Sequence, residues 1–184
     1  MGSPTAALSL TQRWAELIED PTLRDLPYKV ELNAWGKIEM SPASNRHGRL
    51  QARTASELSR QMPQGEAITE ASVLTDIGVR VPDVVWASAG FLKEHGEETP
   101  YSRAPEICIE IVSPSNSDAE TREKVRAYLA AEATEVWVIQ EDGQAHYFDR
   151  SGEVAASRYP VKLDLPGPLS PPSSSSCAWR RPPR

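Results

Sequence analysis

The stretches VRVPDVVW, residues 79–86, and EICIEIV, residues 106–112, have the β-branched composition of buried strands, yet each contains a carboxylate. Asp83 lies in the first stretch and Glu110 in the second. Strand alternation places each acid on a face with apolar neighbours. An ionised carboxylate buried without a partner costs several kcal/mol. We therefore expect a basic partner, hydrogen bonds, an altered protonation state or a metal ion at each acid, and a shared cation would satisfy both.

Helices and strands alternate along the rest of the chain. Candidate N-caps are Ser9 or Thr11, Ser44, and Ser117, which forms a capping box with Glu120. This order predicts an α/β or α+β fold, a mixed sheet with flanking helices and an N-terminal hairpin. The predicted helices are 8–18, 44–62 and 117–132, and the predicted strands are 66–77, 78–88 and 106–115, with hairpins over 28–42 and 135–150 and a polar loop over 93–105.

The composition indicates one folded domain followed by a tail. Hydrophobic residues make up 39% of the chain and charged residues 25%, which is ordinary for a globular protein. We assign residues 1–165 to a single domain and residues 166–184, rich in Pro and Ser, to a disordered tail. No stretch approaches the roughly 20 apolar residues of a membrane helix. Cys108 and Cys177 give no disulfide framework, so we expect a cytoplasmic protein without a membrane partner.

The net charge of −6 limits the kinds of partner that the protein takes. A standing nucleic-acid binder usually shows the opposite balance, because phosphate contacts dominate its affinity. An acidic chain is still compatible with a metal-dependent enzyme, whose bound cations offset part of the charge. The sequence has no zinc-ligand spacing and no GxxxxGK, GxGxxG or GxSxG motif, which counts against zinc, nucleotide and serine-hydrolase chemistry.

Lys124 is the third candidate residue, on the predicted helix 117–132. If this helix packs back across the sheet, its first turns return close to the end of the strand that carries Glu110. A lysine then stands beside Asp83 and Glu110. Two carboxylates that hold Mg²⁺ or Mn²⁺, with a lysine near the attacking water or the transition-state charge, form a constellation suited to phosphodiester cleavage.

Each of these residues also has a structural interpretation. Asp83 follows a proline and could cap backbone N–H groups at a strand end, and Lys124 could form an exposed helix pair with Glu120. Arg80 and Arg103 flank the acids and could be their salt-bridge partners, which would leave no place for a metal. Taken alone, Asp83 and Lys124 fit the structural interpretation better, and the case for chemistry rests on their co-occurrence with Glu110.

At these residues the chain resembles the Uma-two family, a restriction-endonuclease-like branch of the PD-(D/E)xK nuclease superfamily. The resemblance rests on an ordered series of motifs over about residues 28–150: GKIEMSPASNRHGRLQARTASEL, then Pro82-Asp83, PEICIEIVSPSNS and REKVRAYLAAEATEVWVI. It implies a restriction-endonuclease-like core, a mixed sheet flanked by helices, with a metal-dependent active site at one end.

The resemblance also implies roles for individual residues. Asp83 matches the aspartate of the Pro-Asp motif and Glu110 the acid of the ExK motif. The lysine position of that motif is Val112 here, and Lys124 on the following helix resembles the family's relocated lysine. The implied catalytic set is therefore Asp83, Glu110 and Lys124. The implied ligands of Mg²⁺ or Mn²⁺ are Asp83, Glu110 and the backbone carbonyl of Ile111.

Glu39 and His47 match recurrent polar positions of the family and are accessory candidates, although Glu39 also suits the polar face of a hairpin and His47 a helix cap. The implied function is a Mg-dependent endodeoxyribonuclease, a hydrolase with DNA as the favoured substrate, and the assembly could be a homodimer. The alternative is an inactive binding or regulatory module on the same scaffold, which the acidic charge and the unusual C-terminus favour.

Overall fold

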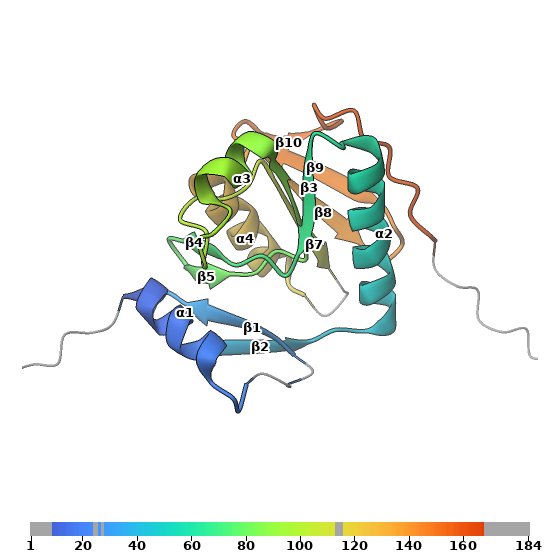
Figure 1. Cartoon of the computed structure of the whole chain (residues 1–184). Coiled ribbons are helices and arrows are strands. Elements are labelled where there is room, and N and C mark those ends of the chain that lie inside the picture. The colour runs from blue at the N-terminus through green and yellow to red at the C-terminus, as the bar shows by residue number, and fades with distance from the viewer. Residues whose placement is uncertain (1–8, 24–25, 27, 113–115, 168–184) are drawn as a thin grey trace, which may run out of the picture.

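The structure is a computed structural model that describes residues 9–23, 26, 28–112 and 116–167. Its strands form two sheets, one of four strands in the order β2-β1-β5-β4 and one of six in the order β10-β9-β8-β7-β6-β3 (Figure 1). The helices are α1 (Leu10–Glu19), α2 (Asn45–Gln61), α3 (Ala89–His95) and α4 (Asp118–Ala130). The strands are β1 (Tyr28–Asn33), β2 (Ile38–Pro42), β3 (Gly65–Thr69), β4 (Val73–Thr75), β5 (Gly78–Arg80), β6 (Val84–Ser88), β7 (Ile107–Val112), β8 (Glu135–Gln140), β9 (Ala145–Asp149) and β10 (Gly152–Val154).

The six-stranded sheet is the centre of the fold and is mixed, as expected. Strands β7 and β8 are parallel, joined through helix α4, and every other pair in this sheet is antiparallel. The alternation predicted for β7 is confirmed. Ile109 and its i±2 neighbours pack in the cluster beneath α2, whereas Cys108 and Val112 belong to the cluster on the opposite face. Glu110 therefore lies on the second face, within an apolar surrounding.

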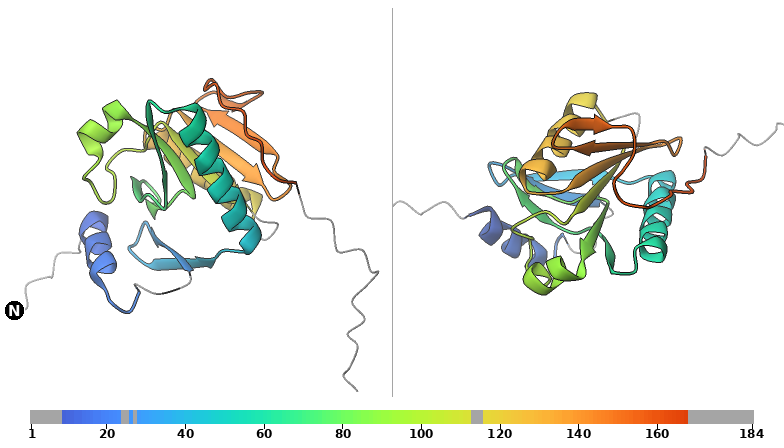
Figure 2. Two further views of the ribbon diagram at one scale, coloured as in Figure 1. Left: turned by 45° about the vertical axis from the view of Figure 1, so that its right-hand side comes forward. Right: turned by 90° about the horizontal axis from the view of Figure 1, so that it is seen from above.

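Helices cover both faces of this sheet (Figures 1 and 2). Leu50 and Leu58 of α2 are fully buried against Ile109 and Trp137, and the segment 159–165 packs beside them. Tyr128 of α4 is buried on the other face. Burial of these side chains fixes both helices relative to the strands, and each fully buried large apolar side chain contributes about 1.5–3 kcal/mol relative to exposure.

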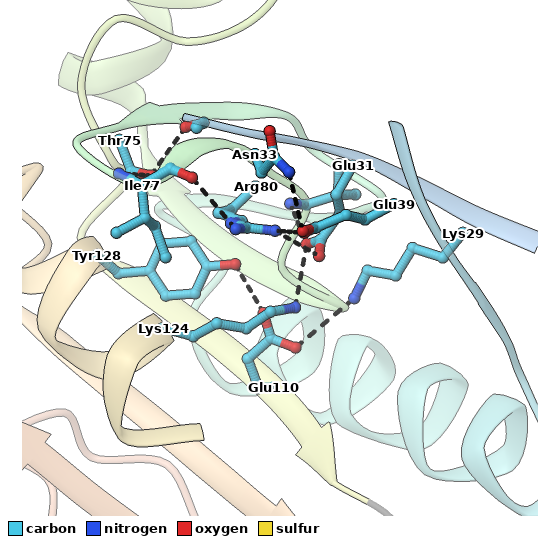
Figure 3. Close-up of polar contacts among 12 residues, drawn as sticks. Lys29, Glu31, Asn33, Glu39, Thr75, Ile77, Arg80, Glu110, Lys124 and Tyr128 are labelled. Atoms are coloured by element: carbon cyan, nitrogen blue, oxygen red, sulfur yellow. Dashed lines mark hydrogen bonds and ion pairs between the residues drawn. The ribbon is translucent and has the colours of Figure 1, made fainter. Parts of the chain in front are cut away.

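The N-terminal layer is a smaller unit built on the β1–β2 hairpin, which turns at Gly36 with a left-handed φ of +71°. Trp14 and Leu17 of α1 pack on one face of this layer against Leu32 and Val79. Side chains at alternate positions of β1, Lys29 and Glu31, point instead into the polar cluster that also contains residues of the large sheet (Figure 3). The site described below thus lies where the two sheets meet.

Two predicted strands are each divided in the structure. The strand predicted over 66–77 breaks at Glu70, whose φ is +57°, so β3 and β4 belong to different sheets. The strand predicted over 78–88 breaks between Arg80 and Val84, because Pro82 has no N–H to donate to a neighbouring strand. Asp83 consequently comes directly before β6 rather than in mid-strand, and its N–H bonds to the Ile109 carbonyl at 2.9 Å.

Several other predictions hold, and two elements were missed. Both hairpins are present, and Ser9, Ser44 and Ser117 cap α1, α2 and α4. Helix α3 was missed, and it contains the start of the loop predicted over 93–105. Strand β10 was missed as well, because it is only three residues long. Most of the predicted tail, residues 168–184 with Cys177, lies outside the described residues.

Candidate functional site

Asp83 is 1% exposed, and its two carboxylate oxygens have different partners. Oδ2 accepts a hydrogen bond from the Ile111 backbone N–H at 2.7 Å. Oδ1 accepts one from Lys29 Nζ at 2.6 Å and lies 3.2 Å from His47 Nε2. Burial opposes ionisation of this carboxyl, but the charges of Lys29 and His47 outweigh it and hold its pKa well below the usual range. Asp83 is therefore an anion at neutral pH.

Glu110 is held in the same manner by three donors (Figure 3). Its Oε1 accepts a hydrogen bond from the buried Tyr128 hydroxyl at 2.6 Å and one from Lys124 Nζ at 3.3 Å. Its Oε2 lies 3.6 Å from Lys29 Nζ. The ammonium group of Lys29 thus bridges the two acids. One cation shared by both carboxylates is the arrangement expected from the sequence, although here the cation belongs to a side chain.

Lys124 also reaches the site, because α4 packs back on the sheet. Its Nζ donates to Glu31 Oε1 at 3.0 Å as well as to Glu110. Burial by itself would lower the pKa of Lys124, but the negative charges of Glu110 and Glu31 outweigh this effect and raise the pKa. The Glu120 carboxylate instead accepts hydrogen bonds from the backbone N–H and the hydroxyl of Ser117 in the capping box. The exposed helix pair considered above is not the main contact of Lys124.

Helix α2 contributes two residues that contact Asp83. His47 lies near Oδ1, and the hydrogen bond to Asp83, stronger than the opposing effect of burial, raises the pKa of the imidazole. Gln51, one turn later, donates from Nε2 to the Asp83 carbonyl at 2.9 Å and to Glu70 Oε1 at 2.7 Å. Both the side chain and the backbone of Asp83 are thereby tied to α2.

Glu39 and the two flanking arginines form no ion pair with Asp83 or Glu110 in the described part of the chain. Glu39 is half exposed and pairs with Arg80, which also lies 3.4 Å from Glu31. Arg103 pairs with Glu132 at 3.3 Å. Glu39 therefore acts on the acids only indirectly, through Arg80 and Glu31.

The cluster opens into a cavity of about 620 Å³. Asp83, Glu110, Lys124 and His47, four of the five side chains singled out in the sequence, line it together with the missed residue Lys29. A second cavity of about 400 Å³ adjoins it and also reaches Glu110 and Lys124. Both acids thus border space for a small ion or for part of a larger substrate.

Comparison with known proteins gives a family. The Uma2 family model, described as "Putative restriction endonuclease", matches residues 16–176. The chain belongs to the Uma2 family. The match is longer than the resemblance over 28–150, since it includes part of α1 and extends into the segment predicted as a tail. A search of curated proteins found no match.

The Uma2 fold is confirmed by a solved structure. A crystal structure described as a putative nuclease belonging to DUF820, from Anabaena variabilis, aligns with a TM-score of 0.59 at 18% identity and covers 74% of this chain and 78% of that chain. At this identity the likeness shows the fold, and the predicted restriction-endonuclease-like core is confirmed. None of the helices in the described ranges is long and apolar enough to cross a membrane.

Four residues of this Uma2 site were missed in the sequence: Lys29, Glu31, Gln51 and Tyr128. Lys29 and Glu31 alternate with apolar residues on β1, which gives the ordinary pattern of a half-exposed strand. The alternation showed that Lys29 and Glu31 share one face of the strand. Nothing in the local sequence showed that the large sheet and α4 cover that face. Tyr128 lies on the apolar stripe of α4, where a buried tyrosine normally needs a hydrogen-bond partner. That need pointed to a polar neighbour without identifying Glu110.

The oxygen atoms around Asp83 and Glu110 are the potential metal ligands of this Uma2 site. Among residues 9–23, 26, 28–112 and 116–167, no group of three or more His, Cys, Asp or Glu side chains is arranged as a metal site. Magnesium, however, commonly takes only one or two carboxylates, with water and substrate phosphates completing its shell. The Ile111 N–H faces Asp83, and the N–H and carbonyl of one strand residue point to the same side. Two carboxylates and this carbonyl fit Mg²⁺ or Mn²⁺.

The pH dependence of stability should reveal the charge of Glu31. Its pKa is lowered, because Lys124 and Lys29 outweigh the effect of burial. The ionised Glu31 therefore contributes fully to the free energy of unfolding when the pH is above about 4.5, its pKa in the unfolded chain. This contribution is lost as the pH falls through the lower pKa of the folded protein. With a chelator present to remove metal ions, Glu31→Gln should lower the free energy of unfolding by about 1–3 kcal/mol at pH 7. The loss should be smaller at acidic pH, where Glu31 of the wild type is protonated.

Urea unfolding at several pH values measures this difference. The exposed Glu97→Gln substitution is the control, because it removes the same charge outside the cluster. A stability loss in Glu31→Gln that stayed constant from pH 7 to strong acid would contradict the ionic role of Glu31.

Proposed function

We propose that this protein is a metal-dependent endonuclease that hydrolyses phosphodiester bonds, with DNA as its substrate. One observation carries the proposal: two buried carboxylates, Asp83 directly before β6 and Glu110 in the neighbouring β7, converge on one cation, the Lys29 ammonium group, at the edge of an open cavity. Membership of the Uma2 family supports a nuclease, and the position of Lys124 supports phosphate chemistry.

In this proposal Asp83, Glu110 and the Ile111 carbonyl hold Mg²⁺ or Mn²⁺. The ion supplies Lewis-acid stabilisation of the charge on the phosphate. Lys124 presents its ammonium group 3.3 Å from Glu110. From there it would orient the attacking water or stabilise the charge of the pentavalent phosphate. His47 has an accessory role, in which its contact with Oδ1 fixes the orientation of Asp83. Glu39 acts at most through Arg80.

The proposal predicts that DNA cleavage depends on a divalent cation. Supercoiled plasmid, single-stranded DNA and RNA are incubated with the protein in MgCl₂, in MnCl₂ or in EDTA. Nicking of the plasmid is expected with either metal and not in EDTA, because the net charge of −6 gives the protein little affinity for phosphates without bound cations. Cleavage that persists in EDTA, or that never exceeds the level of a variant lacking both acids, would contradict the proposal.

A second candidate is a binding or regulatory module without catalysis. The observation that favours it is that Lys29, His47 and Lys124 already compensate the acids. In that case the cluster holds the two sheets together and needs no metal. Calorimetric titration with Mn²⁺ separates the two candidates, since a compensated structural cluster should show no saturable binding.

A further inference from the structure

Lys29 contacts both acids of the proposed metal site from a different sheet. It belongs to β1 of the four-stranded sheet, whereas Glu110 lies in β7 of the six-stranded sheet and Asp83 directly before β6 of that sheet. Its Nζ lies 2.6 Å from Asp83 Oδ1 and 3.6 Å from Glu110 Oε2, and the side chain is only 12% exposed. Figure 3 shows the Lys29 side chain extending toward Glu110. The ammonium group is therefore an internal counter-ion at the point where the two carboxylates converge.

The individual oxygens show what a metal ion would meet there. Oδ2 of Asp83 is engaged by the Ile111 N–H, and Oε1 of Glu110 by the Tyr128 hydroxyl. These backbone and buried donors are fixed by the fold. The two remaining oxygens, Asp83 Oδ1 and Glu110 Oε2, are the pair that Lys29 bridges, and Oδ1 also lies 3.2 Å from His47 Nε2. A cation that bridges the two acids through this pair of oxygens would therefore meet the ammonium group of Lys29.

Lys29 and a divalent ion cannot share these oxygens at close range. An ammonium group and a divalent cation a few ångströms apart repel strongly where solvent is largely excluded. The Lys29 side chain lines the cavity of about 620 Å³, which has room for its ammonium group away from the two acids. A flexible four-carbon stem allows the ammonium group to leave the acids while β1 stays paired with β2 and β5.

We propose that Lys29 is a metal-exchangeable counter-ion, which neutralises Asp83 and Glu110 in the metal-free protein and is displaced from them when a divalent cation binds. This inference rests on the proposed function. It gives Lys29 a regulatory role: the ion pairs that stabilise the empty site must be broken for metal to enter, so Lys29 weakens metal binding and sets the concentration at which the site fills.

The first test is titration of Mn²⁺ by calorimetry into the wild type and Lys29→Met. The matched control is Lys37→Met, which removes the same charge from an exposed position just before β2 of the same hairpin. Lys29→Met should bind Mn²⁺ roughly ten- to a hundredfold more tightly than the wild type, because a competing unit charge is gone. Lys37→Met should bind like the wild type. Equal or weaker binding by a folded Lys29→Met would overturn the inference.

The second test needs no substitution, so it stays decisive if Lys29→Met does not fold. The wild type is treated with an amine-acylating reagent with and without Mn²⁺, and the modification of each lysine is followed by mass spectrometry. Mn²⁺ should accelerate labelling of Lys29, which leaves its two carboxylates, and leave Lys37 unchanged. Labelling of Lys29 that does not respond to saturating Mn²⁺ would show that it stays in place, and the inference would fail.

These results separate this inference from the proposed function. If the wild type binds Mn²⁺ but neither the Lys29 substitution nor the labelling shows exchange, only the counter-ion inference fails. If neither the wild type nor a folded Lys29→Met binds Mn²⁺, the metal site itself is wrong, and the inference falls with it.

Discussion

The double variant Asp83→Asn, Glu110→Gln is expected to lose saturable Mn²⁺ binding and metal-dependent DNA cleavage together. The amides keep the shape of the side chains but remove both negative charges that hold the cation. Cleavage should fall by a factor on the order of 10³ or more, as when central catalytic groups are removed. The variant should still fold, because Lys124 keeps its ion pair with Glu31 at 3.0 Å, and Lys29, left without its two closest anions, lines an open cavity and can reach water.

Calorimetry and a plasmid-nicking assay measure the two losses, and circular dichroism checks the fold. The control is Asp164→Asn, Glu97→Gln, which makes the same chemical change at exposed positions. If the double variant bound Mn²⁺ as the wild type does, the two acids would be structural, and the binding-module candidate would replace the nuclease.

Lys124→Ala should have the second-largest effect, because it acts on stability and on activity. It leaves Glu31 and Glu110 without the cation that they share, at 3.0 and 3.3 Å. The free energy of unfolding should fall by about 2–3 kcal/mol, less than for a fully buried pair since Lys124 is partly exposed. Cleavage should fall roughly a hundredfold beyond any loss from unfolding.

Urea unfolding and plasmid nicking measure these effects, with the exposed Lys93→Ala as the control. Lys124→Arg keeps the charge and should recover most of the stability, but its wider guanidinium group should recover little of the cleavage. An unchanged unfolding midpoint in Lys124→Ala would mean that its ion pairs contribute little and that the side chain is effectively solvated.

The sequence was most informative where local rules decide the structure. Capping residues such as Ser44 and Ser117 located the helices, and alternation assigned the faces of β7. It was least informative at Glu70 and around Pro82, where one run of strand-forming residues is divided between two sheets. Propensity describes each residue in its local context, whereas the choice of neighbouring strand depends on the whole fold.

The candidate site shows the same division. Asp83, Glu110 and Lys124 were predicted to meet, because two acids in apolar strands followed by a capped helix define a recognisable geometry. Lys29 and Tyr128 were not, since a lysine on a hairpin and a tyrosine on a helix stripe have ordinary local explanations. Their roles depend on the way in which the N-terminal layer and α4 close over the strand ends.

Helix α2 has two tasks that restrict how the chain can change in length. Leu58 fixes it in the core, while His47 and Gln51 contact Asp83 from the first turns. One residue inserted between Gln51 and Leu58 would rotate the first turns by about 100° about the helix axis, because an α-helix has 3.6 residues per turn. Insertions there should therefore be rejected during divergence unless they restore whole turns of the helix.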